Sequence, residues 1–205
     1  MKRLLALATV LLFCLSAHAQ YGIGTRTGAT AASGGGGSTN FGVTSQNTNL
    51  GNGNANFQLY SIFTTVTAET PTSCSVYVYA GTTSGKHIEC GIYTSVVTDA
   101  HWVSTMVCHA AYTETGSESG FVTISLSGAG CGTLSATTTY FVFSNTDDSA
   151  ISMGGYNCGS SCAGAFPSST FAGQYAGVTY GTYPSNPILS SESPNQFSLY
   201  ITATP

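Results

Sequence analysis

The sequence predicts an all-β protein, a single antiparallel β-sandwich of jelly-roll type that is held together by disulfides. Short runs in which apolar and polar residues alternate recur between clusters of turn-forming residues, at spacings of roughly 8–12 residues. Thr, Val and Tyr, which favour strands, are abundant in these runs. No long stretch combines a helical apolar period with capping residues.

The alternating runs define the expected strands. In one of them Val76 and Val78 share a face while Tyr77 and Tyr79 share the other, as in a strand with one buried face. The run at 140–143 is apolar throughout, which is typical of a central strand covered on both sides. The expected strands lie at residues 57–66, 74–80, 87–94, 102–111, 121–126, 140–143, 151–156 and 197–202.

The N-terminus has the three parts of a secretory signal peptide. A positive start is followed by an apolar core at 4–15 and by the cleavage site Ala17-His18-Ala19. A lipoprotein signal would instead use Cys14, but Phe13 stands where such a signal needs a small residue. We therefore expect residues 1–19 to be a signal peptide and the protein to be secreted or held at the cell surface.

The rest of the chain divides into two parts. Residues 20–39 are rich in Gly, Ala, Ser and Thr and are expected to form a flexible leader. This leader is either a plain linker or a strand donated to a neighbouring subunit, in which case the protein would self-associate. Residues 40–205 form the sandwich domain, which is long enough for one core.

Charged side chains are scarce, at 6% of the sequence. After removal of the signal, two basic residues, Arg26 and Lys86, and eight acidic residues remain, which gives a formal charge of −6. Nucleic acids and anionic lipids are bound by clustered Lys and Arg, so neither is an expected partner. No later segment is apolar enough for membrane insertion.

Six cysteines follow the signal, and an even number in an exported chain indicates disulfides. One pair flanks a turn at Gly81 and Thr82 that would place its members opposite each other on a hairpin, and another flanks a tight loop. The alternative is zinc at the C-x₃-C motif, although a second ligand pair at ordered spacing is absent. The expected disulfides are Cys74–Cys90, Cys108–Cys131 and Cys158–Cys162.

Three runs carry a resemblance to a known family: Cys90-Gly91-Ile92-Tyr93-Thr94-Ser95, Thr133 to Val142, and Phe197 to Ala203. They resemble the L-G-I-Y-S-D, x-L-x-A-G-T-T-Y-W-L and closing x-Y-S-I-Y-A-T patterns of bacterial secreted jelly-roll modules. Such modules recur in exported proteins of unassigned role and in multidomain proteins that handle carbohydrate. The resemblance implies the fold and supplies no catalytic residues. This chain departs from the pattern at Thr137, where the family has Gly, and at Phe141, where it has Trp; its cysteines look peculiar to it.

The sequence contains only weak matches to catalytic or ligand-binding motifs. The run Gly81 to His87 resembles a phosphate loop in composition, but it is one residue short and precedes a strand, so a hairpin turn is expected. Asp147 and Asp148 lie in a polar loop that could bind calcium, although an ordinary turn is favoured. His101 and His109 would be too far apart along one strand to share a metal. We expect no catalytic residues, no metal site and no cofactor.

Residues 156–183 combine aromatic rings with Gly and Ser. Rings on the rim of a sandwich can stack on sugars, whereas a loop of this length ordinarily folds over the sandwich and buries its own rings. The candidate binding residues are Tyr156, Tyr175, Tyr180 and Tyr183.

Together these features predict a secreted, non-catalytic binding or surface module, with a polysaccharide or another glycan as the leading ligand. The first alternative is a structural subunit of an extracellular filament or coat. The second is a glycan-active enzyme, which would need two carboxylates facing each other across a cleft. No such pair stands out in the sequence.

Overall fold

The computed structural model describes residues 37–44, 55–95, 103–157, 172–176, 178–184, 191–193 and 195–205. The expected signal peptide, nearly all of the leader, Cys158, Cys162 and His101 lie outside these residues. All regular structure in the described ranges is β-strand. The strands are β1 (Thr39–Gly42), β2 (Phe57–Thr64), β3 (Thr70–Ala80), β4 (His87–Ser95), β5 (Val103–Thr113), β6 (Gly120–Ser125), β7 (Thr139–Thr146), β8 (Ser152–Met153), β9 (Gly155–Asn157), β10 (Ala172–Ala176), β11 (Ser191–Ser193), β12 (Asn195–Phe197) and β13 (Leu199–Thr204).

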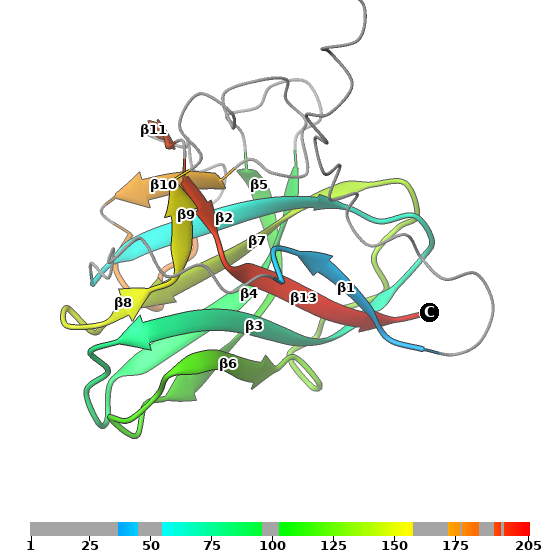
Figure 1. Ribbon diagram of the computed structural model, residues 1–205. Coiled ribbons are helices and arrows are strands. Elements are labelled where there is room, and N and C mark those ends of the chain that lie inside the picture. Colours follow the sequence, from blue (N-terminus) through cyan, green and yellow to red (C-terminus); the bar gives the residue numbers. More distant parts are fainter. Residues whose placement is uncertain are drawn as a thin grey trace, which may run out of the picture.

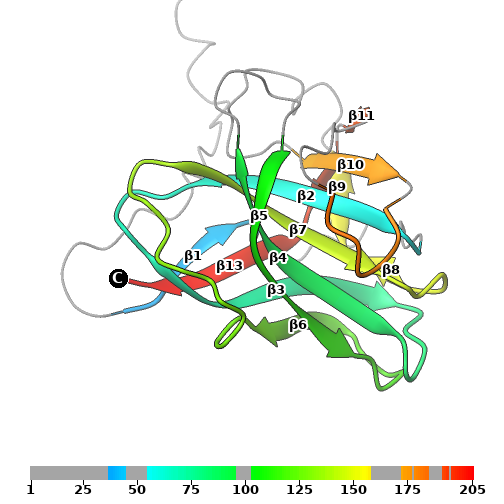
Figure 2. The same ribbon diagram turned by 180° about the vertical axis from the view of Figure 1, so that it is seen from behind.

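Two antiparallel sheets pack face to face and form the β-sandwich that the sequence predicts (Figure 1). Sheet A has the order β1-β13-β3-β6, and β8 also pairs with β3. Sheet B has the order β11-β10-β2-β7-β4-β5 and faces the viewer in Figure 2. Strands β9 and β12 form a separate ribbon.

The core fills the space between the sheets. Val76 and Val78 of β3 point into it and are almost fully buried, as their alternation predicts. Strand β7 lies between β2 and β4, and its residues from Tyr140 to Thr146 are all buried, so both of its faces are covered, as expected of an apolar run. Its Val142 joins the main core, while Phe141 and Phe143 belong to a second cluster that also includes buried residues of β2 and β4.

Two of the expected strands are interrupted where the chain leaves sheet A. The run at 151–156 is split at Gly154 into β8 and β9, and the closing run is split at Ser198 into β12 and β13. Both breaks meet at Tyr77, whose N–H donates to the Ser198 carbonyl (3.0 Å) and whose carbonyl accepts from Gly154 N–H (2.7 Å). Ser198 N–H in turn donates to the Gly154 carbonyl (3.0 Å). This junction lets β9 and β12 continue as a ribbon beyond the sheet.

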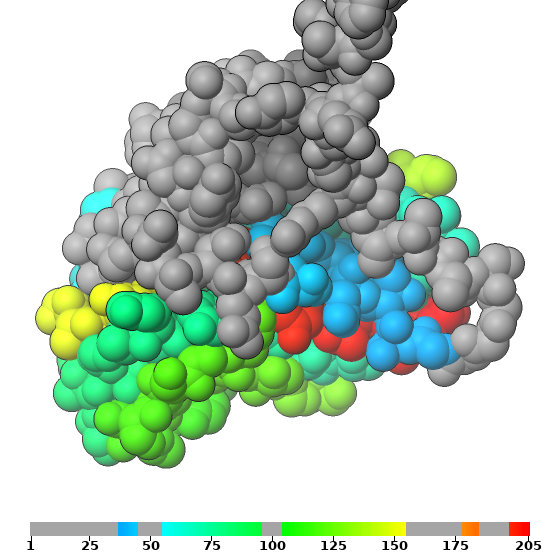
Figure 3. Space-filling view, in the orientation of Figure 1, coloured from blue at the N-terminus to red at the C-terminus, as the bar shows by residue number. Residues whose placement is uncertain are grey.

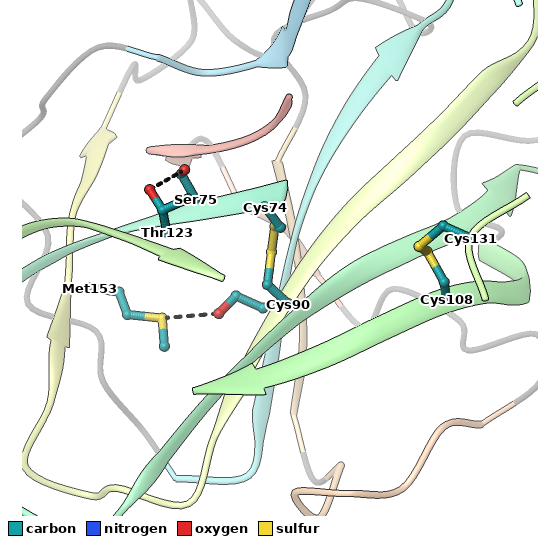
Figure 4. Close-up of a disulfide and its surroundings, with 8 residues drawn as sticks. Cys74, Ser75, Cys90, Cys108, Thr123, Cys131 and Met153 are labelled. Carbon is teal, nitrogen blue, oxygen red and sulfur yellow. Dashed lines mark hydrogen bonds between the residues drawn. A yellow bond between two sulfur atoms is a disulfide. The ribbon is translucent and has the colours of Figure 1, made fainter. Parts of the chain in front are cut away.

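The predicted pair Cys74–Cys90 is confirmed, but the hairpin expected around it is wrong. Cys74 lies on β3 of sheet A and Cys90 on β4 of sheet B, because the connection at 81–86 carries the chain from one sheet to the other. The disulfide therefore joins the two sheets across the core, with the Cα atoms 6.0 Å apart (Figure 4). The pair Cys108–Cys131 is also confirmed and ties β5 to the turn after β6.

Candidate binding site

The segment 178–184 lies against the outer side of sheet B, beside β10 (Figure 2). It carries two of the four predicted binding residues, Tyr180 and Tyr183. The other two are described only by their backbone: Tyr156 lies on β9, and Tyr175 on β10 is the register partner of Gln58 on β2. The structure thus places Tyr175 on a strand of the sheet that Tyr180 and Tyr183 contact, and Tyr156 in the separate ribbon.

Tyr180 is held in place by a backbone hydrogen bond and by ring stacking. Its N–H donates to Asn56 Oδ1 (3.0 Å), and two residues earlier the Val178 carbonyl accepts from Asn145 Nδ2 (3.2 Å). Its ring stacks on His87, with centroids 5.4 Å apart and planes at 22°. Burial, followed by the negative charges of Glu89 and Asp147, raises the pKa of Tyr180 to about 12.

Tyr183 is half-buried and is held more firmly. Its hydroxyl donates to Glu89 Oε2 (2.7 Å), and its ring lies 4.0 Å from that of His109, centroid to centroid. Phe143 lies below it at 6.4 Å. These contacts fix the segment to the sheet, so both described tyrosines present only part of their rings to solvent.

A row of buried polar residues crosses sheet B beneath this segment. Glu89 on β4 and Asn145 on β7 are cross-strand partners, Gln58 lies on the neighbouring strand β2, and each of the three is at most 1% exposed. The Tyr60 hydroxyl donates to Gln58 Oε1. Four buried polar atoms on this face find no hydrogen-bond partner in the described part of the chain: Gln58 Nε2, Glu89 Oε1, Tyr93 Oη and His109 Nδ1.

Burial changes the pKa values of two residues on this face. It raises the pKa of Glu89, an effect that Tyr183, Gly181 N–H and Asn145 offset only in part. Burial also lowers the pKa of His109, which favours its neutral form. The sequence signal for Glu89 was its position inside an apolar strand, but nothing in the sequence showed that Tyr183 lies over it.

The surroundings of Gly91 explain why the run Cys90-Gly91-Ile92-Tyr93 has a glycine at this position. A Cβ at this position would lie 2.2 Å from the Cys108 carbonyl oxygen, 2.7 Å from Phe143 Cε1 and 2.8 Å from His109 Cα. The missing side chain leaves room for the Phe143 ring and for the approach of β5. Gly91 therefore shapes the floor beneath Tyr183.

The outer face of sheet A carries a second group of aromatic rings. The Phe121 ring lies 5.1 Å from Tyr77 and 5.1 Å from Tyr200, edge to face in both pairs. Tyr79 continues the row along β3 and is 52% exposed. The sequence placed Tyr77 and Tyr79 on one face, but Phe121 and Tyr200 join them only because β6 and β13 flank β3.

Hydroxyl and amide groups occupy the rest of this face. Ser75 Oγ and Thr123 Oγ1 lie 3.0 Å apart, and Thr202 Oγ1 donates to Asn40 Oδ1 (2.8 Å) (Figure 4 shows the first pair). In the described strands of sheet A the outward positions hold no Asp, Glu, Lys, Arg or His. They are Asn40, Ser73, Ser75, Tyr77, Tyr79, Phe121, Thr123, Ser125, Tyr200 and Thr202.

The two aspartates considered for calcium have separate partners. Asp147 accepts from His87 N–H (2.6 Å) and lies 3.0 Å from His87 Nδ1. Asp148 accepts from Thr83 N–H and Ala150 N–H. Within the described ranges no three metal-binding side chains come together.

The described residues include no helix that is long and apolar enough to cross a membrane. The two disulfides indicate an oxidising compartment. Comparisons with protein-family models, with curated proteins and with solved structures found no match for this chain.

Proposed function

We propose that the protein is a secreted, non-catalytic module that binds neutral carbohydrate through the outer face of sheet A. The observation that carries the proposal is the uncharged row of rings across β13, β3 and β6, in which Tyr77 is buried, Phe121 and Tyr200 are partly exposed and Tyr79 is exposed. Sugars are neutral polyols whose C–H faces stack on aromatic rings and whose hydroxyls pair with neutral donors and acceptors. The strands of this face form part of the surface visible in Figure 3.

The tyrosines of segment 178–184 offer a second carbohydrate surface, but their geometry supports it less well. Tyr180 already stacks on His87, and the Tyr183 hydroxyl is bonded to Glu89. We expect alanine at either position to lower stability more than glycan retention. Tyr79 has more of its ring free for a ligand.

A retention assay tests the proposal. The processed chain, residues 20–205, is incubated with insoluble cellulose, chitin and xylan, and the bound fraction is measured. Tyr79→Ala should weaken retention on the order of tenfold, or about 1.4 kcal/mol, if the ring is a main contact. Val66→Ala is the matched control, because Val66 is equally exposed (55%) but lies outside the row of rings. No retention of the parent, or equal losses in both variants, would contradict the proposal.

The structural-subunit alternative rests on the leader. Thr39–Gly42, where the leader ends, forms an edge strand on β13 of the same chain. A module that works alone should sediment as a monomer at micromolar concentration. Concentration-dependent polymers that vanish when residues 20–36 are removed would instead favour the filament or coat subunit.

A further inference from the structure

A carboxyl group is buried on the outer face of sheet B without a positively charged partner. Glu89 is 1% exposed, and its Oε1 accepts no hydrogen bond from the described residues. The nearest ionisable base is His109, with Nδ1 4.0 Å from Glu89 Oε2, and burial favours its neutral form. Lys86, the sole Lys or Arg in the described ranges, is exposed and makes no ion pair there. A buried carboxyl group either pairs with a counter-ion or becomes protonated, and a cation next to Glu89 would stabilise its charged form.

Aromatic rings surround this carboxyl group. Tyr183 lies over His109, Phe143 lies 6.4 Å from Tyr183, and Tyr93 lies 5.1 Å from Phe143. The faces of such rings attract cations, most strongly where water is excluded. Glu89 Oε1 and His109 Nδ1 are themselves buried, so a ligand would reach them past the His109 side chain, which is 34% exposed, and past the half-buried Tyr183.

We propose that Glu89, His109, Tyr183 and Phe143 form a binding site for an alkylammonium group. Glu89 supplies the negative charge, its free Oε1 and the free Nδ1 of His109 accept N–H bonds, and the rings contact the carbon next to the nitrogen. A neutral sugar would fill the same acceptors but leave the carboxylate charge unbalanced. A metal ion would need more ligands than the two side chains, Glu89 and His109, that the cluster offers.

The ammonium group would come from a free amine or from a lysine side chain of another protein, and the two sources share one chemistry. Ethylammonium chloride probes the first, and Nα-acetyl-lysine methylamide probes the second. Sodium chloride and ethanol at equal concentrations control for salt and for the alkyl chain. The readout is the NMR spectrum of the processed protein, with the ring signals of His109 and Tyr183 assigned.

Saturable shifts of the His109 and Tyr183 signals with either ammonium compound, and with neither control, are expected. A tighter fit of the lysine compound would identify the lysyl source. Glu89→Gln should weaken binding by at least about tenfold, because the amide keeps the shape but removes the charge. Glu114→Gln, just beyond the end of β5 and bonded to Thr83 instead of to the cluster, should bind as the parent does.

Binding by Tyr183→Phe and saturation of the NMR shifts test the proposal even if Glu89→Gln does not fold. Tyr183→Phe retains the ring and releases Glu89 Oε2, so it should bind at least as well as the parent. Shifts that do not saturate, or that ethanol reproduces, would overturn the site. So would unchanged binding in Glu89→Gln. None of these measurements involves a glycan, so they stand apart from the test on sheet A.

Discussion

Glu114 and Asp148 accept hydrogen bonds from one backbone N–H, that of Thr83, at 3.0 and 2.7 Å. Both residues are 2% exposed. Burial first, and then the adjacent Asp148, raise the pKa of Glu114 to about 7. Burial alone would raise the pKa of Asp148, but bonds from Ala150, Glu114 and Thr83 lower it. Glu114 is therefore the group that is protonated below about pH 7, because two neighbouring carboxylates cannot both ionise cheaply.

The first prediction is a fall in stability between pH 4.5 and 8. Because the folded protein holds the Glu114 proton that the unfolded chain releases near pH 4.5, this contribution is complete below pH 4.5 and is lost as the pH rises through about 7. The loss is at most about 3 kcal/mol. Glu114→Gln should remove this slope and melt above the parent at pH 8. Thermal melts between pH 4 and 9 measure the effect, and parallel curves for parent and variant would refute it.

Glu118 provides a control of opposite sign. Burial is the largest single influence and raises the pKa of Glu118, but bonds from Thr115, Thr82 and its own N–H together outweigh it and lower the pKa. Its contribution to stability is therefore present above the unfolded pKa and is lost as the pH falls. Glu118→Gln should destabilise the protein at pH 7 and match the parent more closely at pH 3.

The second prediction concerns Thr137, which has φ +51° although it is β-branched. This is the position where the resembled pattern has Gly, and glycine adopts such a backbone without a steric penalty. Thr137→Gly should raise the free energy of unfolding by about 1 kcal/mol. Ala136→Gly, at a neighbour without a positive φ, should lower it by a similar amount. Urea unfolding of both variants tests this prediction, and equal destabilisation would argue against strain at Thr137.

The third prediction is that Gly91→Ala is costly. The added Cβ would overlap the Cys108 carbonyl and the Phe143 ring, so β4 and β5 would have to separate. We expect a loss of about 3 kcal/mol. Gly132→Ala is the control, because no atom lies within 4 Å of the added Cβ and φ is not positive. Equal melting of the two variants would show that the overlap is relieved without cost.

The fold was predictable because alternation identifies the buried face of each strand. Val76, Val78, Leu199 and Ile201 are all in the core, as their spacing predicts. The hairpin around Cys74 and Cys90 was wrong because a turn between two strands does not show whether the strands share a sheet. The short strands β10 and β11 were missed because Gly, Ala and Glu have weak strand preferences, and β1 was missed because it is only four residues long and begins where the expected leader ends.

The candidate sites were harder to predict because each needs an order of strands that no local pattern contains. Phe121 and Tyr200 lie 79 positions apart and meet across β3. Glu89 falls within the expected strand at 87–94, but nothing in the sequence shows that it is buried on the outer face of sheet B. Its partner Tyr183 was singled out for its ring, whereas its hydroxyl makes the decisive contact.

The last prediction concerns the order in which the disulfides open. Cys74 and Cys90 are both 0% exposed between the sheets, whereas Cys131 is only partly buried. A reductant attacks an accessible sulfur, so mild dithiothreitol without denaturant should open Cys108–Cys131 while Cys74–Cys90 stays closed. Alkylation and peptide mapping identify the opened pair, and early labelling of Cys74 would contradict a sealed core.

Without reductant the processed chain should lack six hydrogens, which also tests the third predicted pair, Cys158–Cys162. Replacing Cys74 and Cys90 together by Ala should cost about 3 kcal/mol, because the bond closes a loop of 16 residues and holds the two sheets together.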